Sequence, residues 1–268
     1  MKFNVKSLLA LATAASALVL AGCGDDEAAA HKIKLGVMAG AEAQVAEVAK
    51  KIAKEKYDLD VELVTFTDYV TPNAALDNGD VDINAFQHKP YLDQQIADRG
   101  YKLAIVGNTF VYPLAGYSKE VTSVDQIQDG ARIAVPNDPT NLGRALILLE
   151  QQGLLKLKEG AGLKATVQDV VENPKNIEIV ELEAAQLPRS LDDVTVAIIN
   201  NTFASQLNLS PEKDGVFVES KDSPYVNLIV AREDNKDAEN VKEFVKAYQT
   251  EEVYQEAQKL FGGIVKGW

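Results

Sequence analysis

The alternation of short apolar strands with amphipathic helices restricts the fold of this chain more than any other feature. Residues 33–37 and 59–66 have strand patterns, and residues 42–56 between them carry apolar side chains at helical spacing. A β-α-β unit of this kind implies a parallel strand pair joined by a right-handed crossover. Further strands are expected at residues 81–86, 103–111, 131–135, 177–182, 194–199 and 226–230, helices at 90–99, 142–152, 238–249 and 251–260, and a helical turn at 187–191. The sequence therefore predicts an α/β protein with mainly parallel sheets.

Two segments have the pattern of crossings between lobes. Residues 111–117 and residues 220–226 each combine a proline with apolar or aromatic neighbours beside an expected strand. A chain that leaves one α/β lobe, builds a second and returns crosses twice, and the two lobes then enclose a cleft that can close over a solute. We expect residues 32–112 plus 225–268 to form the first lobe and residues 113–224 to form the second.

The N-terminus has the pattern of an exported lipoprotein. A positively charged start is followed by an apolar stretch at residues 7–20, which is shorter than the roughly 18–20 residues of a spanning helix. The stretch leads into Leu-Ala-Gly-Cys, which resembles the lipobox of bacterial lipoproteins, and Cys23 is the only cysteine. We expect a signal peptide at 1–22 and a tether at 23–31. Acyl chains on Cys23 would insert in a lipid bilayer and anchor the protein to it. An ordinary signal peptide with a chance cysteine near its cleavage point is the alternative.

Composition and missing motifs narrow the function. The net charge is −13 and no basic cluster occurs, so no nucleic-acid partner is expected. With only His31 and His88 as histidines, HExxH and His-rich metal sites are excluded. Phosphate-loop and nucleophile-elbow patterns are absent, and a GxGxxA match at 160–165 follows a charged run and is interpreted as a turn. We expect no enzyme activity, metal or cofactor, although a hydrolase with paired carboxylates stays open.

Aromatic residues gather where an expected strand turns into a helix. Phe86, His88 and Tyr91 lie at the end of the strand at 81–86, and Tyr69 lies near the end of the preceding β-α unit. Because ligands bind at the carboxyl ends of strands in open α/β sheets, these side chains could surround a small apolar group. Sulfur packs favourably about 5 Å from aromatic rings. The alternative is that Phe86 and Tyr91 are core residues and that His88 caps a helix.

Polar residues gather at the start of a later helix. Residues 136–144 follow an expected strand, and their backbone N–H groups, with Arg144 one turn into the helix, could receive a carboxylate. Asn141 lies three residues before Arg144 and can face the same side. Asn200 and Asn227 lie within or at the end of apolar strands, where a buried amide needs a partner. A capped helix with a solvent-facing arginine, and amides bonded to neighbouring loops, are the ordinary alternatives.

Six segments spread over nearly the whole mature chain carry a resemblance to a known family. They are NAFQHKPYLDQQ (84–95), VGNTFVYPLAGYS (106–118), VPNDPTNLGR (135–144), VVENPKN (170–176), LPRSLDD (187–193) and SPYVNLIV (223–230). The chain resembles the methionine-binding lipoproteins of the MetQ/NlpA family. The resemblance implies a two-lobed, type II periplasmic-binding-protein fold with the ligand in the interlobe cleft, two hinge crossings, and delivery of methionine to an ABC importer.

The resemblance also implies a role for each candidate residue. Arg144 would pair with the α-carboxylate of methionine with support from Asn141. Asn200 and Asn227 would complete the polar grip, and Asn200 is preferred to its neighbour Asn201. The pocket around the thioether side chain would be formed by Tyr69, Phe86, His88 and Tyr91.

The implied partners are L-methionine, with D-methionine left open, and the permease and ATPase complex of the importer. The protein would be a lipid-anchored monomer that faces the periplasm, with the inner membrane favoured over the outer membrane. Other interpretations stay open. The ligand could be another small apolar amino acid or a methionine-containing dipeptide, or the chain could be a surface adhesin or scaffolding lipoprotein.

Overall fold

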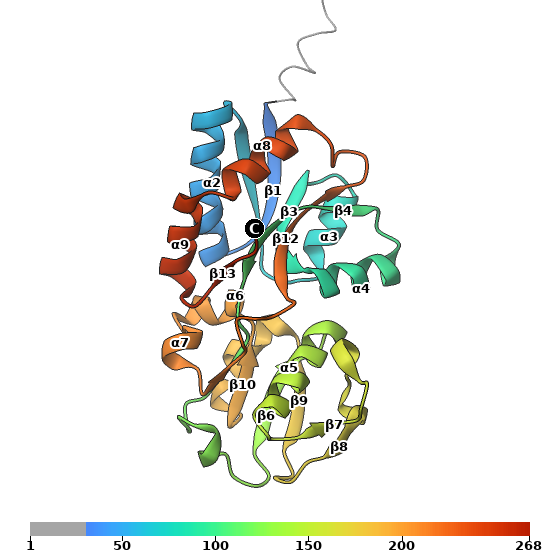
Figure 1. Cartoon of the computed structure of the whole chain (residues 1–268), viewed down its shortest axis with the longest axis vertical. Helices are drawn as coiled ribbons and strands as arrows, with labels where there is room; N and C mark the ends of the chain where they lie inside the picture. The colour runs from blue at the N-terminus through green and yellow to red at the C-terminus, as the bar shows by residue number, and fades with distance from the viewer. Residues whose placement is uncertain (1–30) are drawn as a thin grey trace, which may run out of the picture.

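The computed structural model describes residues 31–268. The expected signal peptide, the lipidated Cys23 and nearly all of the tether therefore lie outside the described residues. From residue 31 onward, no helix is both long enough and apolar enough to cross a membrane. This part of the chain forms two lobes, each built around one large sheet and stacked along the long axis of the molecule (Figure 1).

The sheet of the first lobe combines parallel and antiparallel strands. β1 (Lys32–Met38) pairs in parallel with β2 (Asp60–Phe66) and with β3 (Ile83–His88). Its other three strands are antiparallel to their neighbours. These strands are β4 (Leu103–Val111), β12 (Val226–Arg232) and β13 (Val265–Lys266), and the order across the sheet is β13-β4-β12-β3-β1-β2.

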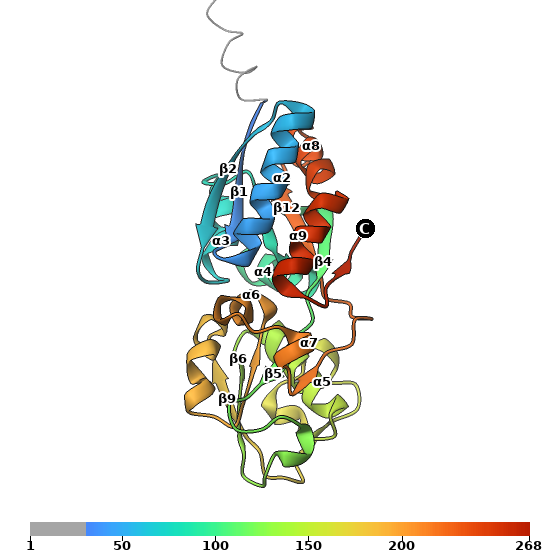
Figure 2. The same cartoon turned by 90° about the vertical axis from the view of Figure 1, so that its left-hand side faces the viewer.

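Helices cover both faces of this sheet, so its strands are buried on both sides. One face carries α2 (Ala41–Tyr57), α8 (Glu239–Tyr248) and α9 (Glu251–Phe261), and the other carries α3 (Thr71–Asp77) and α4 (Lys89–Arg99) (Figures 1 and 2). Successive side chains of a strand point to opposite faces. In β12, accordingly, Ile229 packs into the core beneath α2 and Val230 into the core beneath α3 and α4.

The second lobe has a smaller sheet in the order β11-β5-β10-β6-β9. Its strands are β5 (Ala115–Tyr117), β6 (Arg132–Pro136), β9 (Glu178–Leu182), β10 (Val196–Ile199) and β11 (Phe217–Val218). Its α-helices are α5 (Pro139–Gln151), α6 (Asn201–Ala204) and α7 (Pro211–Asp214), and the longest of its 3₁₀ helices is Ala184–Asp192. A separate antiparallel pair joins β7 (Lys156–Leu157) to β8 (Val170–Glu172). The apolar side of α5 and the inner face of the sheet form one core.

The expectation of mainly parallel sheets is wrong, because both large sheets are mixed. β10 pairs in parallel with β6, and β6 with β9, but β5 is antiparallel to both of its neighbours. The cause is the crossing of the chain between lobes. Strands that end at the cleft run one way, and β5 and β12, which enter their sheets from the cleft, must run the other way.

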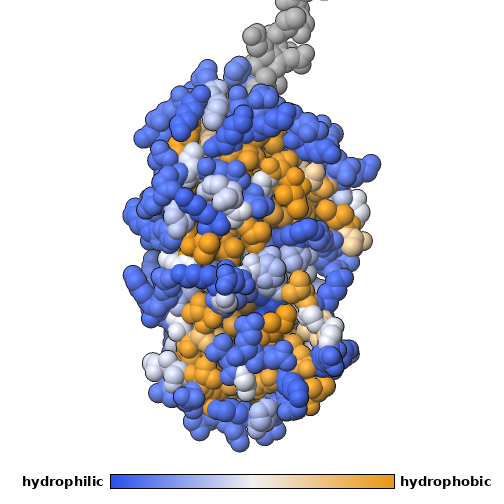
Figure 3. All heavy atoms as spheres, in the orientation of Figure 1, coloured by the Kyte–Doolittle hydropathy of each residue, from blue (hydrophilic) through white to orange (hydrophobic). Residues whose placement is uncertain are grey.

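The chain passes between the two sheets twice, as predicted. It leaves the first sheet after Val111 and enters the second at Ala115, and it returns between Val218 and Val226. The carboxyl ends of β3, β6 and β10 therefore meet at the junction of the lobes. Hydrophobic residues gather over both lobes on the face shown in Figure 3, with hydrophilic residues around them.

Candidate functional site

One pocket between the lobes brings together every residue that the sequence singled out as a ligand contact. These are Tyr69, Phe86, His88, Tyr91, Asn141, Arg144, Asn200 and Asn227. The pocket is completed by Gln87, Tyr112, Asn201 and Thr202. The space between these side chains is about 360 Å³ when the open mouth of the cleft is included, and little of it is enclosed. Their contacts with a ligand remain predictions.

Aromatic rings form one wall of the pocket. The ring of Phe86 lies 5.9 Å from that of Tyr69 and 6.0 Å from that of Tyr91, measured between centroids. The Tyr91 hydroxyl donates a hydrogen bond of 2.7 Å to the backbone carbonyl of Tyr69, which holds the Tyr91 ring in place. Phe203 of the second lobe packs against Tyr69 at 4.9 Å. The two lobes thus share this apolar wall, and its rings are core residues and pocket residues at once.

His88 both caps a helix and reaches across the cleft. Its Nδ1 accepts a hydrogen bond of 3.2 Å from the backbone N–H of Tyr91 at the start of α4. The proton of the neutral ring therefore resides on Nε2, which donates to Oδ1 of Asn141 at 3.2 Å. Burial lowers the pKa of His88 to about 3, and the Arg144 charge adds to the effect. His88 therefore caps α4, as the alternative expected, and it also lines the pocket, while its contact with a ligand stays a prediction.

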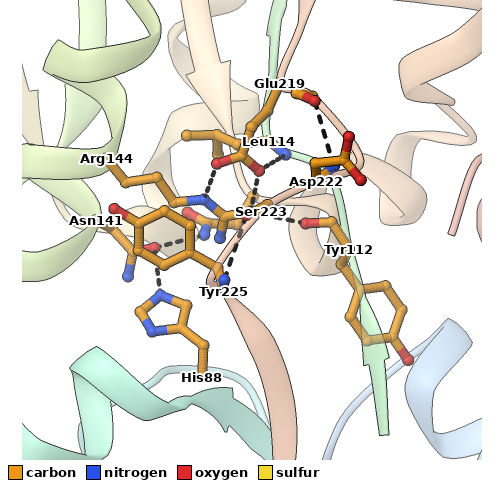
Figure 4. Close-up of polar contacts among 11 residues, drawn as sticks. His88, Tyr112, Leu114, Asn141, Arg144, Glu219, Asp222, Ser223 and Tyr225 are labelled. Carbon is orange, nitrogen blue, oxygen red and sulfur yellow. Dashed lines mark hydrogen bonds and ion pairs between the residues drawn. The ribbon is translucent and has the colours of Figure 1, made fainter. Parts of the chain in front are cut away.

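Asn141 is held by the cap of its own helix. The Asp138 carboxylate accepts from the backbone N–H of Asn141 at 3.0 Å and from its Nδ2 at 2.9 Å. This orientation turns Oδ1 of Asn141 toward the cleft, where it accepts from His88 (Figure 4). The same oxygen accepts from Nδ2 of Asn200 at 2.9 Å. Asn141 therefore orients two neighbouring pocket residues, one from each lobe.

Arg144 faces the pocket and not solvent, and its charge is already compensated. Its Nε donates to Glu219 at 2.9 Å, and its Nη2 donates to the same carboxylate and, at 2.9 Å, to the backbone carbonyl of Tyr112 (Figure 4). The ring of Tyr225 lies 4.3 Å from the guanidinium carbon. These contacts engage Nε and Nη2 and fix the plane of the guanidinium, which leaves Nη1 to bind an oxygen anion.

Two neighbouring amides hold atoms that have no protein partner. Asn201 is 2% exposed, yet its Oδ1 and Nδ2 are both buried without a hydrogen bond to any residue of the described chain, and so is Oδ1 of Asn200. An unpaired buried polar group costs about 1–3 kcal/mol, so a ligand is a natural partner for these atoms. Nδ2 of Asn227 donates to the carbonyl of Phe86 at 3.1 Å, which places its amide at the same pocket.

Sequence reasoning missed four features of the pocket for different reasons. Gln87 belongs to a buried amide cluster with Asn73 and Asn84, and the fully buried strand INAFQH gave a signal that was not used. Tyr112 lies in a predicted crossing segment, but its contribution is a backbone carbonyl. The sequence favours Asn200 over Asn201 as the inward amide, whereas both line the pocket. Nothing in the sequence pattern marked Glu219 as the partner of Arg144.

Solved structures share this architecture. A crystal structure of the methionine binding protein MetQ superposes with a TM-score of 0.88 at 70% identity, covering 89% of this chain and 99% of that one. A nutrient binding protein from Burkholderia cenocepacia bound to methionine gives a TM-score of 0.86 at 51% identity, covering 88% of this chain and 100% of that one. A periplasmic substrate-binding protein of an ABC transporter from Coxiella burnetii gives 0.85 at 47% identity, covering 88% and 100%.

The sequence comparisons extend over the whole chain. It is 74% identical over 269 residues to the probable D-methionine-binding lipoprotein MetQ of Vibrio cholerae serotype O1, with 100% of both chains covered. The family model of the NlpA lipoprotein matches residues 33–268, which include both lobes and the whole pocket. The chain belongs to the NlpA lipoprotein family.

Proposed function

We propose that this chain is the substrate-binding lipoprotein of an ABC importer and that it captures methionine in the cleft between its lobes. The observation that carries the proposal is the pairing of two unlike surfaces in one pocket. One is the aromatic wall around Phe86. The other is polar: it combines the Arg144 guanidinium with side-chain atoms of Asn200 and Asn201 that lack protein partners. A free amino acid with an apolar side chain needs both.

The polar side of the pocket matches the charged half of an amino acid. Nη1 of Arg144 and Nδ2 of Asn201 are donors for the α-carboxylate, and Oδ1 of Asn200 and Oδ1 of Asn201 are acceptors for the ammonium group. Asn227 lines the same pocket and can add a hydrogen bond to the charged half of the ligand. Closure of the lobes excludes water, which strengthens each of these charged contacts. The Glu219 carboxylate keeps the cleft from holding an uncompensated arginine charge before the ligand enters.

The aromatic side of the pocket matches a thioether side chain. Tyr69, Phe86 and Tyr91 present ring edges and faces within about 6 Å of each other. Sulfur beside aromatic rings contributes about 0.3–1.5 kcal/mol beyond ordinary burial. Because burial and the nearby Arg144 keep His88 neutral, the wall stays free of charge and suits an apolar group. L-methionine fits this description, and D-methionine presents the same groups.

The importer, the anchor and the lobe boundaries complete the proposal. The relatives are named lipoproteins, and one structural neighbour is the periplasmic substrate-binding protein of an ABC transporter. We propose that a monomer anchored through acylated Cys23 faces the periplasm from the inner membrane and docks on the permease and ATPase complex. The distribution of strands between the two sheets supports lobes at 32–112 plus 225–268 and at 113–224. Capture and release of the ligand require no catalysis by this chain.

The ligand can be identified without prior choice. Protein purified from growing cells would be analysed by native mass spectrometry, then stripped by unfolding and refolding, and offered an equimolar mixture of amino acids and methionine-containing dipeptides. Selection of methionine is the expected result. Selection of a different small amino acid or a dipeptide would contradict methionine as the ligand but support the role of a solute-binding protein. No selection by the folded protein would favour the adhesin alternative.

A further inference from the structure

Glu42 is a buried acid that joins the two lobes beside the pocket. It lies in the first turn of α2 in the first lobe and is only 4% exposed. Its Oε1 accepts a hydrogen bond of 2.5 Å from the hydroxyl of Thr202, which belongs to α6 of the second lobe and lines the pocket. The bond therefore exists only when the lobes are together.

The surroundings of Glu42 supply no positive charge. The titratable groups that face it are the phenols of Tyr69, Tyr112 and Tyr248, and burial raises the pKa of each phenol, so all three are neutral. Burial raises the pKa of Glu42 itself to about 8, and the Thr202 hydrogen bond opposes this only in part. A carboxyl that is buried without a cation favours its protonated form.

Opening of the cleft reverses these conditions. Movement of the second lobe takes Thr202 away and lets water reach the carboxyl, whose pKa then returns toward its ordinary value of about 4.5.

We propose that Glu42 is a positioning residue that couples lobe closure to proton uptake: the lobes close over the ligand when the carboxyl binds a proton and holds Thr202. This inference rests on the proposed function. The closed state binds the proton more tightly than the open state, so closure is favoured at low pH and loses this contribution as the pH rises toward 8. His88 acts in the opposite direction, since closure buries it in the neutral form, but its effect is small above about pH 7.

The first test compares pH profiles of methionine affinity for the native protein and Glu42→Gln. Glutamine keeps the shape and the acceptor for Thr202 but does not titrate. Between about pH 6.5 and about pH 8.5 we expect the affinity of the native protein to fall about tenfold, and that of the variant to change less than about threefold. The control is Glu47→Gln on the exposed side of α2, which should follow the native profile. Parallel profiles for Glu42→Gln and the native protein would overturn the inference.

The second test needs no variant. Calorimetric titrations of the native protein with methionine at about pH 7.5, in two buffers with different ionisation heats, give the number of protons taken up on binding. We expect more than about half a proton per methionine, after the small release from His88 is included. Methionine binding without proton uptake would refute the coupling between closure and Glu42, and the proposed methionine-binding function would still stand. Absence of methionine binding at every pH would instead refute the proposed function.

Discussion

The guanidinium of Arg144 and the carboxylate of Glu219 form a buried ion pair with two hydrogen bonds at the junction of the lobes. Arg144 lies in α5 of the second lobe, and Glu219 lies in the segment that returns to the first sheet. The pair therefore ties the cleft to a hinge crossing. A ligand carboxylate that bound Nη1 would join a guanidinium whose plane is already set, which reduces the cost of ordering it.

Arg144→Ala tests the carboxylate role. We expect methionine affinity to fall more than about 100-fold, because the α-carboxylate of the ligand would lose its cation. Truncation of one member of a buried, hydrogen-bonded charge pair between binding partners costs about 2–5 kcal/mol. Arg99→Ala, at the exposed end of α4, is the matched control and should change affinity less than about twofold. Isothermal titration calorimetry measures both.

The same substitution leaves Glu219 buried without its cation, so stability must be followed as well. Arg144→Ala combined with Glu219→Ala removes both charges and should recover much of the thermal stability, but not the affinity. Equal, mild losses of affinity in Arg144→Ala and Arg99→Ala would remove Arg144 from the site.

Asn201→Ala distinguishes a ligand contact from a structural amide. Because both polar atoms of this side chain lack protein partners, its removal should leave the stability of the ligand-free protein unchanged or raise it by about 1 kcal/mol. Methionine affinity should nevertheless fall about tenfold. Urea unfolding and calorimetry together provide the test, and a loss of stability with unchanged affinity would show that the amide has a structural role only.

Asn227→Ala should weaken binding without unfolding the protein. The substitution removes one hydrogen bond to the Phe86 carbonyl, which contributes about 1 kcal/mol to stability. It also removes a side chain from the pocket wall. Far-ultraviolet circular dichroism should be unchanged while the dissociation constant rises about tenfold or more. Native affinity in the folded variant would exclude Asn227 from the site.

His88 makes folding stability depend on pH. The ring has a pKa of about 3 in the folded protein and about 6.5 when unfolded, so the unfolded chain takes up a proton first as the pH falls. Stability from this residue is present above about pH 6.5 and decreases below it, by about 2 kcal/mol between about pH 7 and about pH 5.

His88→Asn keeps a helix-capping acceptor and removes the titration. Urea unfolding of the native protein and of His88→Asn at both pH values isolates the effect, since contributions from all other groups, including Glu42, are common to both. The variant should lose about 2 kcal/mol less than the native protein on acidification. An identical loss in both proteins would show that His88 is not buried in the neutral form.

The sequence anticipated what depends on local pattern. Apolar periodicity located β1, α2, β12 and the C-terminal helices to within a few residues, and the proline-bearing crossing segments were correctly assigned. The short helix α3 was missed, because seven residues with one proline leave little periodicity to detect. The antiparallel strands were missed because strand direction follows from the way the chain crosses between lobes and not from the composition of the strand.

In the pocket, too, local patterns predicted some residues and long-range contacts determined others. Residues at strand ends and helix starts were predictable, because topology brings such ends together, and all eight line one pocket. Glu219 and Glu42 were not, since each is defined by a partner far away in the sequence, Arg144 and Thr202 respectively. Local patterns do not reveal which of many carboxylates will be buried against such a partner.

Calorimetric titration of L-methionine into the chain from Gly24 onward, unfolded and refolded beforehand to remove carried-over ligand, tests the central claim most directly. The account predicts tight one-to-one binding of methionine, with leucine and glycine much weaker. Absence of heat with methionine from a folded protein that is verified to be empty, at each of several temperatures, would contradict it.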